Sequence, residues 1–248
     1  MPHRLKFIVA YDGTPFAGWQ SQAGGNTIQD LLEKAFVRVA GEAIRVHGSG
    51  RTDAGVHALA QCAHVDVPTR KLPPESWTGA LNDSLPSAIR VVRCRYVRGD
   101  FHARFNAKGK LYRYRIWNER FLSPFEIDRA WHVPAQLDFA GMQSSVAQFI
   151  GRHDFASFTA NRGHPNESTI RTIHIARAQR RGSCITLEFA GDGFLYKMVR
   201  LIAGALVRGA RDGATKNEIV QRLENPHAKL HARPSAPAAG LYLVRVFY

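Results

Sequence analysis

The first hundred residues switch between hydrophobic patterns of period two and patterns of helical period. Four short alternating or apolar runs predict strands: 5–11, 44–47, 62–67 and 89–97. Two runs with apolar residues at helical spacing predict helices: 28–39 and 73–85. The second of these helices opens on Pro73-Pro74 and stops before Pro86. The resulting order, β-α-β-β-α-β, is that of a ferredoxin-like unit.

The remainder of the chain repeats this alternation. Four further strands are predicted: 110–117, 169–178, 183–190 and 241–247. Three helices are predicted: 137–150, 195–207 and 216–223. We therefore expect an α+β fold of two pseudo-symmetric ferredoxin- or RRM-like halves, residues 1–104 and 105–248, whose antiparallel sheets meet around a central basic cleft.

Charge is the feature of the composition that departs from an ordinary globular protein. Lysine and arginine outnumber aspartate and glutamate by 34 to 20 in 248 residues, which gives a formal net charge of +14. A charge of this size is typical of a protein with a polyanionic partner. A generic basic surface kept for solubility is the alternative, and the predominance of arginine favours phosphate contact and base stacking.

Other sequence features narrow the class of protein. Cys62, Cys94 and Cys184 are odd in number and widely spaced, so no disulfide framework or zinc site is indicated. No P-loop or Gly-x-Gly-x-x-Gly pattern is present, which argues against nucleotide cofactors. The N-terminus lacks the apolar run of a signal peptide, and no segment has the length and apolarity of a membrane span. We expect a cytoplasmic protein.

The most informative segment is the glycine-punctuated loop Gly48-Ser49-Gly50-Arg51-Thr52-Asp53-Ala54-Gly55. Asp53 is the only acidic residue between Glu42 and Asp66, and Arg51 lies two positions before it. Glycines permit positive φ and the close approach of another molecule. Asp53 is therefore a candidate for a catalytic carboxylate, with the capping of an Asx-turn as the structural alternative.

A second candidate region alternates aromatic and basic residues. On the predicted strand 110–117, Tyr112 and Tyr114 share one face and Arg113 lies on the other. Aromatic faces beside arginines recur in RNA-binding sites. A core-facing aromatic stripe is the alternative, and we expect it to hold for at least one of the tyrosines.

The later helix carries a basic stripe of Lys197, Arg200 and Arg208 among apolar neighbours. A largely buried arginine there requires a partner, for which a carboxylate is the expected choice. Residues 101–105 also mix aromatics with Arg104, and we take Arg104, Arg113 and Lys197 as candidates for RNA contact. The polar segments 161–166 and 225–239 are either RNA-facing loops or solvated connectors.

Together these motifs resemble the TruA family of tRNA pseudouridine synthases. The resemblance rests on six blocks in family order: Tyr11-Asp12-Gly13 with Gly18-Trp19-Gln20 and Gln22, Gly50–His57, Phe101–Phe105, Tyr112-Arg113-Tyr114, Met198-Val199-Arg200 and Gly240–Leu243. It covers nearly the whole chain. Two departures are Ser49, where alanine is expected, and Ser21, where a basic residue is common, which puts one RNA contact in doubt.

The resemblance implies that uridines 38, 39 and 40 of the tRNA anticodon stem-loop become pseudouridine, in a homodimer and without a cofactor. It implies roles for five residues: Asp53 as the catalytic aspartate, Arg200 as its basic partner, Tyr112 against the target uracil, Leu241 in the base pocket and Arg51 in base extrusion. It implies no metal.

The chemistry of the residues agrees with this assignment. Moving C1′ from N1 to C5 of the same ring is redox-neutral and needs an ionised carboxylate, which a nearby guanidinium favours. A non-catalytic RNA-binding protein explains the charge and the aromatics but gives Asp53 no role. An RNA methyltransferase would need a glycine-rich cofactor loop, which the sequence lacks.

Overall fold

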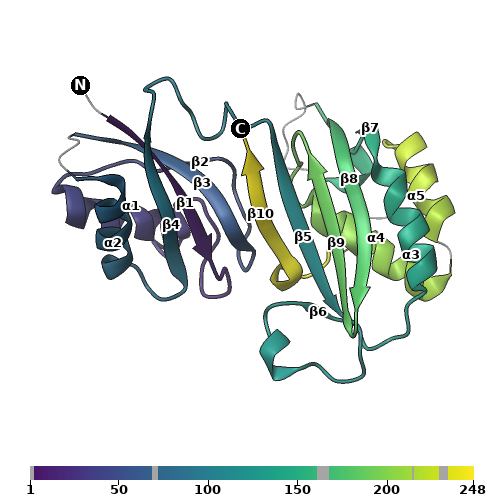
Figure 1. Ribbon diagram of the computed structural model, residues 1–248. Helices are drawn as coiled ribbons and strands as arrows, with labels where there is room; N and C mark the ends of the chain where they lie inside the picture. The colour runs from purple at the N-terminus through teal and green to yellow at the C-terminus, as the bar shows by residue number, and fades with distance from the viewer. Residues whose placement is uncertain (1–2, 69–71, 161–167, 214, 229–233) are drawn as a thin grey trace. The chain divides into compact units, whose positions relative to one another are not determined.

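The computed structural model describes residues 3–68, 72–160, 168–213, 215–228 and 234–248. The chain forms two compact units (Figure 1). Unit 1 comprises residues 1–108 together with 242–248, and unit 2 comprises residues 109–241. The last strand therefore returns to the unit in which the chain begins, although the sequence division assigned residues 105–248 to one half.

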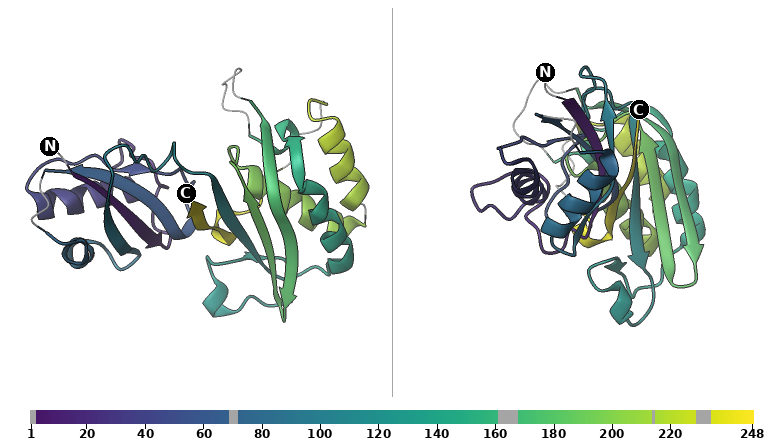
Figure 2. Two further views of the ribbon diagram at one scale, coloured as in Figure 1. Left: turned by 45° about the horizontal axis from the view of Figure 1, so that its top comes forward. Right: turned by 60° about the vertical axis from the view of Figure 1, so that its left-hand side comes forward.

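Unit 1 follows the predicted order of elements through its first hundred residues. Its elements are β1 (His3–Tyr11), α1 (Ile28–Ala40), β2 (His47–Gly48), β3 (His57–Val67), α2 (Pro74–Ser84) and β4 (Ile89–Val97). The sheet runs β4-β1-β3, with β2 also paired to β3 and with both β4 and β3 antiparallel to β1. Figure 2 shows α1 and α2 on the same face of this sheet.

The core of unit 1 lies between this sheet and its two helices. In β1, Leu5, Phe7 and Val9 are fully buried and alternate with more exposed residues, as a strand with one covered face requires. Phe7 packs against Phe36 of α1, and Phe36 packs against Trp77 of α2. The aromatic contacts therefore join the sheet to both helices.

The C-terminal strand β10 (Leu241–Phe247) completes unit 1. Within this unit it pairs in parallel with β3, Tyr242 opposite His57 and Leu243 opposite Ala58. The Lys108 N–H donates to the Phe247 carbonyl, and the Tyr248 hydroxyl donates to the Ala103 carbonyl. These contacts fix the end of the chain against residues 57–58 and 103–108.

Unit 2 contains a sheet in the order β5-β9-β8-β7, all antiparallel, with β6 added in parallel to β5. Its strands are β5 (Gly109–Trp117), β6 (Trp131–His132), β7 (Gly151–Asp154), β8 (Ile170–Arg181) and β9 (Cys184–Gly191). Its helices are α3 (Phe139–Val146), α4 (Met198–Asp212) and α5 (Thr215–Glu224). Figure 1 shows the three helices gathered on one side of this sheet.

Most predicted elements are confirmed, and the differences have local causes. The strand predicted at 44–47 is present but shifted: β2 comprises His47–Gly48, because pairing with β3 begins only at His47. The helix predicted from residue 195 begins at Met198, because Lys197 adopts a left-handed conformation with φ of 58°. The helix predicted over 137–150 ends at Val146 and continues as a 3₁₀ turn, Ala147–Phe149.

The fold is mixed α+β with mostly antiparallel strands. Unit 2 departs from a plain β-α-β-β-α-β order, because β6, β7 and α5 are additional elements. Across the described parts of the chain, no helix combines the length and apolarity needed to cross a membrane.

Candidate active site

The loop that carries Asp53 is held in place by the segment that follows β1. The Trp19 N–H donates to the Thr52 carbonyl at 3.0 Å, and the hydroxyls of Tyr11 and Thr52 are hydrogen-bonded at 2.8 Å. Tyr11, Trp19 and Thr52 are all buried. Asp53 therefore follows a residue that is fixed through both its backbone and its side chain.

Two glycines make this arrangement possible. A Cβ added to Gly13 would lie 2.1 Å from the Val56 carbonyl oxygen, so only glycine lets the two backbones approach. Gly55 has φ of 75°, in the left-handed region where glycine carries no Cβ penalty. The loop turns at Gly55, and the Val56 N–H donates to the Asp53 carbonyl at 3.1 Å.

A buried glutamine anchors the start of the loop. Gln61 of β3 is fully buried, and its Nε2 donates to the Gly50 carbonyl at 2.8 Å. The Ser49 hydroxyl donates to Gln61 Oε1 at 2.6 Å, and the Ser49 N–H donates to the Cys62 carbonyl at 2.8 Å. Ser49, where the resemblance leads one to expect alanine, thus has a structural role.

The end of the loop is fixed at the first residue of β3. His57 is 2% exposed, and its Nδ1 accepts the Gly13 N–H at 3.1 Å. Its ring stacks on Tyr242 of β10, with the ring centroids 4.6 Å apart. The loop is thus supported at its beginning, its middle and its end by side chains of unit 1.

The two predicted functional side chains of the loop differ in exposure. Asp53 is half-buried, whereas Arg51 is exposed. Arg51 Nε donates to Oε1 of Gln20 at 3.0 Å. The structure therefore presents a carboxylate and a guanidinium two residues apart on a backbone that is rigidly held.

In unit 2, the two tyrosines of β5 have different surroundings. Tyr114 is fully buried and its hydroxyl donates to the Pro237 carbonyl at 2.7 Å. Burial raises the pKa of Tyr114, while the charge of Arg200 acts in the opposite direction. Tyr112 is 9% exposed, and its ring packs edge-on against Phe194. The expectation that at least one tyrosine is a core residue is confirmed for Tyr114.

Arg200 is bound to the segment that precedes β10. Its Nε donates to the Ala236 carbonyl at 2.8 Å, and its own carbonyl accepts the Ala236 N–H at 3.0 Å. Residues Ala238–Gly240 then form a 3₁₀ turn that leads into Leu241, which is 7% exposed. The start of α4, Tyr114 and the turn before Leu241 thus meet within unit 2.

The three candidates for RNA contact lie in separate places. Arg104 belongs to unit 1, with its guanidinium carbon 5.9 Å from the ring centroid of Phe105, which is 76% exposed. Lys197 precedes α4, and its Nζ lies 5.2 Å from the Tyr196 ring. Arg113 donates to the Glu188 carboxylate through Nε and Nη2, at 3.0 and 2.9 Å.

The predicted site residues thus divide between the units: Arg51 and Asp53 belong to unit 1, and Tyr112, Arg200 and Leu241 belong to unit 2. The segment 161–166 lies outside the described residues. The described ranges of the chain contain no group of three or more metal-binding side chains.

Sequence reasoning missed the supporting residues Tyr11, Gln61 and His57. The hydrophobic periodicity of β1 identified Tyr11 only as a strand residue. The strand predicted at 62–67 began after Gln61, so neither His57 nor Gln61 was assigned to it. Buried polar residues that bond to a loop leave no periodic signal, although two histidines, a glutamine and an aspartate within the largely apolar strand His57–Val67 were an available sign.

Comparison with known proteins identifies the family. The sequence model described as tRNA pseudouridine synthase matches residues 7–106 and 146–248. The chain is 45% identical to tRNA pseudouridine synthase A of Akkermansia muciniphila over 251 aligned positions, covering 99% of this chain and 95% of that protein. It is 41% identical to the protein of the same name from Acetivibrio thermocellus over 244 positions, covering 98% and 99%.

Proposed function

Because the chain belongs to the tRNA pseudouridine synthase family and is an isomerase that acts on tRNA, we propose that it converts uridines 38, 39 and 40 of the anticodon stem-loop to pseudouridine, with Asp53 as the catalytic carboxylate. The observation that carries this proposal is the loop itself. Its only carboxylate follows a residue fixed by Tyr11 and Trp19, in a protein of net charge +14. A carboxylate held rigidly in a basic protein suits chemistry on RNA better than phosphate binding.

The proposed reaction breaks the N1–C1′ bond of a uridine and forms a C1′–C5 bond to the same ring. C5 gives up its hydrogen as a proton, N1 gains one, and no electrons leave the nucleoside. Asp53 acts on the nucleotide as nucleophile or as base, and the flipped uridine is held away from its neighbours during the exchange.

We propose that four other residues act on the same uridine. Tyr112 packs on the uracil, Leu241 lines the base pocket, Arg51 assists extrusion of the nucleotide, and Arg200 favours the ionised form of Asp53. The candidates for contact with the rest of the tRNA are Arg104, Arg113 and Lys197. We further propose that the protein acts in the cytoplasm as a homodimer, with two related halves that present one basic RNA-binding surface.

Tritium release from tRNA labelled at uridine C5 tests the proposal. The wild type is expected to release tritium, and Asp53→Asn is expected to lower release at least 10³-fold, as removal of a catalytic group does, while tRNA binding is retained. Asp83→Asn, which alters an exposed carboxylate of α2, is the control and is expected to leave release unchanged.

Transcripts that carry a single labelled uridine at position 38, 39 or 40 test the choice of site. Release from all three is the expected result. Release only from uridines elsewhere would contradict the positions and leave the isomerase assignment intact. Full activity of Asp53→Asn would exclude Asp53 as the catalytic carboxylate.

A further inference from the structure

The hydrogen bond between Arg51 and Gln20 is the end of a longer chain of side-chain amides. We propose that Gln20, oriented by the buried Gln29, is a positioning residue that presents the Arg51 guanidinium for extrusion of the target uridine. This inference rests on the proposed function, because it assigns Gln20 a part in the step given there to Arg51.

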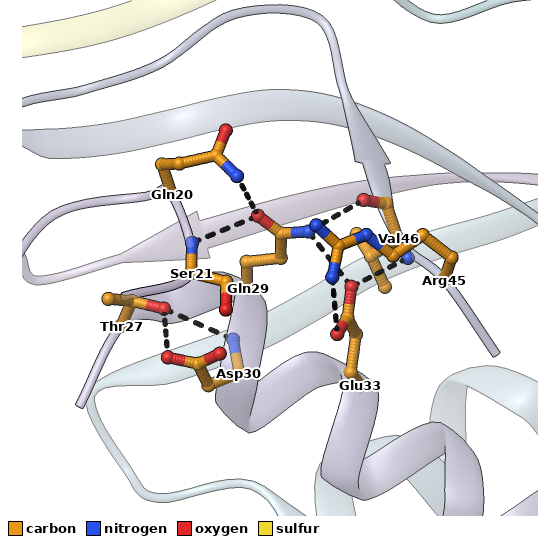
Figure 3. Close-up of polar contacts among 8 residues, drawn as sticks. All are labelled: Gln20, Ser21, Thr27, Gln29, Asp30, Glu33, Arg45 and Val46. Carbon is orange, nitrogen blue, oxygen red and sulfur yellow. Dashed lines mark hydrogen bonds and ion pairs between the residues drawn. The ribbon is translucent and has the colours of Figure 1, made fainter. Parts of the chain in front are cut away.

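The amide of Gln29 can be placed in one orientation only. Its Nε2 lies 2.9 Å from a Glu33 carboxylate oxygen and 3.2 Å from the Val46 carbonyl oxygen. A carboxylate and a carbonyl accept hydrogen bonds and cannot donate them. Its Oε1 lies 3.0 Å from the backbone N–H of Ser21, which only donates. Both sides of the amide are therefore determined by partners that cannot exchange roles (Figure 3).

The orientation of Gln29 determines that of Gln20. Oε1 of Gln29 is an acceptor, so Gln20 must offer it the Nε2 group, at 3.1 Å. The carbonyl oxygen of the Gln20 amide then faces away from Gln29, as Figure 3 shows. That oxygen accepts the Nε–H of Arg51 at 3.0 Å. The acceptors Glu33 and Val46 thus determine the donor and acceptor ends of both amides, and so place an acceptor oxygen beside Arg51.

The chain of bonds begins at a well-anchored point. Gln29 is 3% exposed and lies in the first turn of α1. Glu33, one turn later, also accepts the Val46 N–H at 3.0 Å through the same carboxylate oxygen and forms an ion pair with Arg45 at 3.4 Å. The amide chain therefore starts on a helix and ends on the loop of Asp53.

The bond to Gln20 suits a guanidinium that has to act on a ligand. The bond uses only Nε of Arg51, so the two terminal NH₂ groups take no part in it. Together these two groups form a fork that matches a phosphate or a base edge. An exposed arginine loses rotamer freedom when it binds a ligand, and a side chain that is ordered beforehand loses less. Gln20 thus orders Arg51 before the tRNA arrives.

Substitution of Gln20 by leucine tests this role. Gln20→Leu keeps a similar volume and removes the acceptor of Arg51, so we expect the single-turnover rate of tritium release to fall about tenfold, the effect of one hydrogen bond to a charged group. We expect tRNA affinity to change less than about twofold, because the terminal nitrogens are still present. Gln22→Leu is the matched control, since the Gln22 amide bonds to the Ala17 carbonyl in the same segment.

A double-mutant cycle with Arg51→Ala shows whether Gln20 acts through Arg51. In the Arg51→Ala background, Gln20→Leu is expected to have no further effect on the rate. Stopped-flow fluorescence of 2-aminopurine beside the target uridine is expected to show extrusion slowed by the same factor as tritium release. A tenfold loss that persists without Arg51, or a wild-type rate for Gln20→Leu, would overturn the inference.

Stability and wild-type activity complete the test. Thermal unfolding is expected to leave Gln20→Leu folded at the assay temperature, and Gln20→Met repeats the measurement with an unbranched side chain. Unfolding of both variants would show a structural role and overturn the positioning role. Absence of release by the wild type would overturn the proposed function as well, whereas wild-type release with unimpaired Gln20 variants would overturn this inference alone.

Discussion

A buried polar side chain joins several other groups in each unit, Gln29 in unit 1 and Glu188 in unit 2, and the two differ in charge. In unit 1, the neutral Gln29 amide uses all four of its hydrogen-bonding positions on Gln20, Ser21, Glu33 and Val46. In unit 2, the Glu188 carboxylate binds two arginines of neighbouring strands, Arg113 and Arg177. An amide has a donor side and an acceptor side, so its network carries direction. A carboxylate is an acceptor on both sides and so imposes no such order.

The difference teaches where each kind of network is useful. Arg113, Glu188 and Arg177 are directly opposite one another on β5, β9 and β8, so the ionic network ties three strands together. Burial of Glu188 raises its pKa, but hydrogen bonds and charge from Arg177 and Arg113 outweigh burial and leave the pKa below its ordinary value of 4.5. The Gln29 network instead orients side chains beside the Asp53 loop.

The largest effect on stability is expected from Gln29→Leu. The half-buried Ser21 N–H and the buried Val46 carbonyl lose their partner, which costs about 3 kcal/mol of unfolding free energy. Urea denaturation measures this change. Gln143→Leu, which removes a single long bond to the Ala178 carbonyl, is the control and is expected to cost less than about 1 kcal/mol. Equal costs for the two variants would show that the Gln29 network adds nothing beyond one bond.

A smaller effect, dependent on pH, is expected from Glu188→Gln. The Glu188 charge lies between two half-exposed arginines, and its loss is expected to lower the free energy of unfolding by about 2 kcal/mol near pH 7. Because the folded-state pKa of Glu188 is lowered, its contribution is present above the ordinary pKa and is lost as pH falls through the lowered value. The difference in free energy of unfolding between wild type and Glu188→Gln, measured by urea denaturation, is therefore expected to become smaller at acidic pH.

Glu224→Gln, at the exposed end of α5, provides the control for this titration. It is expected to leave the pH dependence of stability unchanged. If the difference in free energy of unfolding between wild type and Glu188→Gln stays constant down to pH 3, the charge of Glu188 is not the source of that difference.

The smallest effect is expected from Thr27→Ala, at the N-cap of α1. The Thr27 hydroxyl accepts the Asp30 N–H and donates to the Asp30 carboxylate, so its loss is expected to cost about 1 kcal/mol. Thr78→Ala in α2 removes a hydroxyl that donates to the Pro74 carbonyl of its own helix and also contacts the Cys94 thiol, and is expected to cost less unfolding free energy than Thr27→Ala. A larger loss for Thr78→Ala would contradict the assignment of Thr27 as the stabilising cap.

Much of the secondary structure was predictable, because periodicity and capping are local. The helix after Thr27, the strand 241–247 and the pair of strands before α4 all follow from spacing and breakers. The candidate status of Asp53 also followed from local sequence. The bonds that position its loop did not, because Tyr11 and Thr52 are 41 residues apart and Gln20 and Arg51 are 31 apart. Side-chain pairing over such separations depends on the register of the sheet, which a single sequence does not reveal.

Because β10 belongs to unit 1, unit 1 is completed after unit 2 during synthesis. Residues 1–108 leave the ribosome before unit 2, yet the strand that pairs with His57 and Ala58 is synthesised only after unit 2. Unit 2, which is continuous in sequence, can be completed earlier. The ring of Tyr242 that stacks on His57 therefore becomes available only after all of unit 2 has been synthesised. A nascent chain that ends within unit 2 lacks this support at the end of the Asp53 loop.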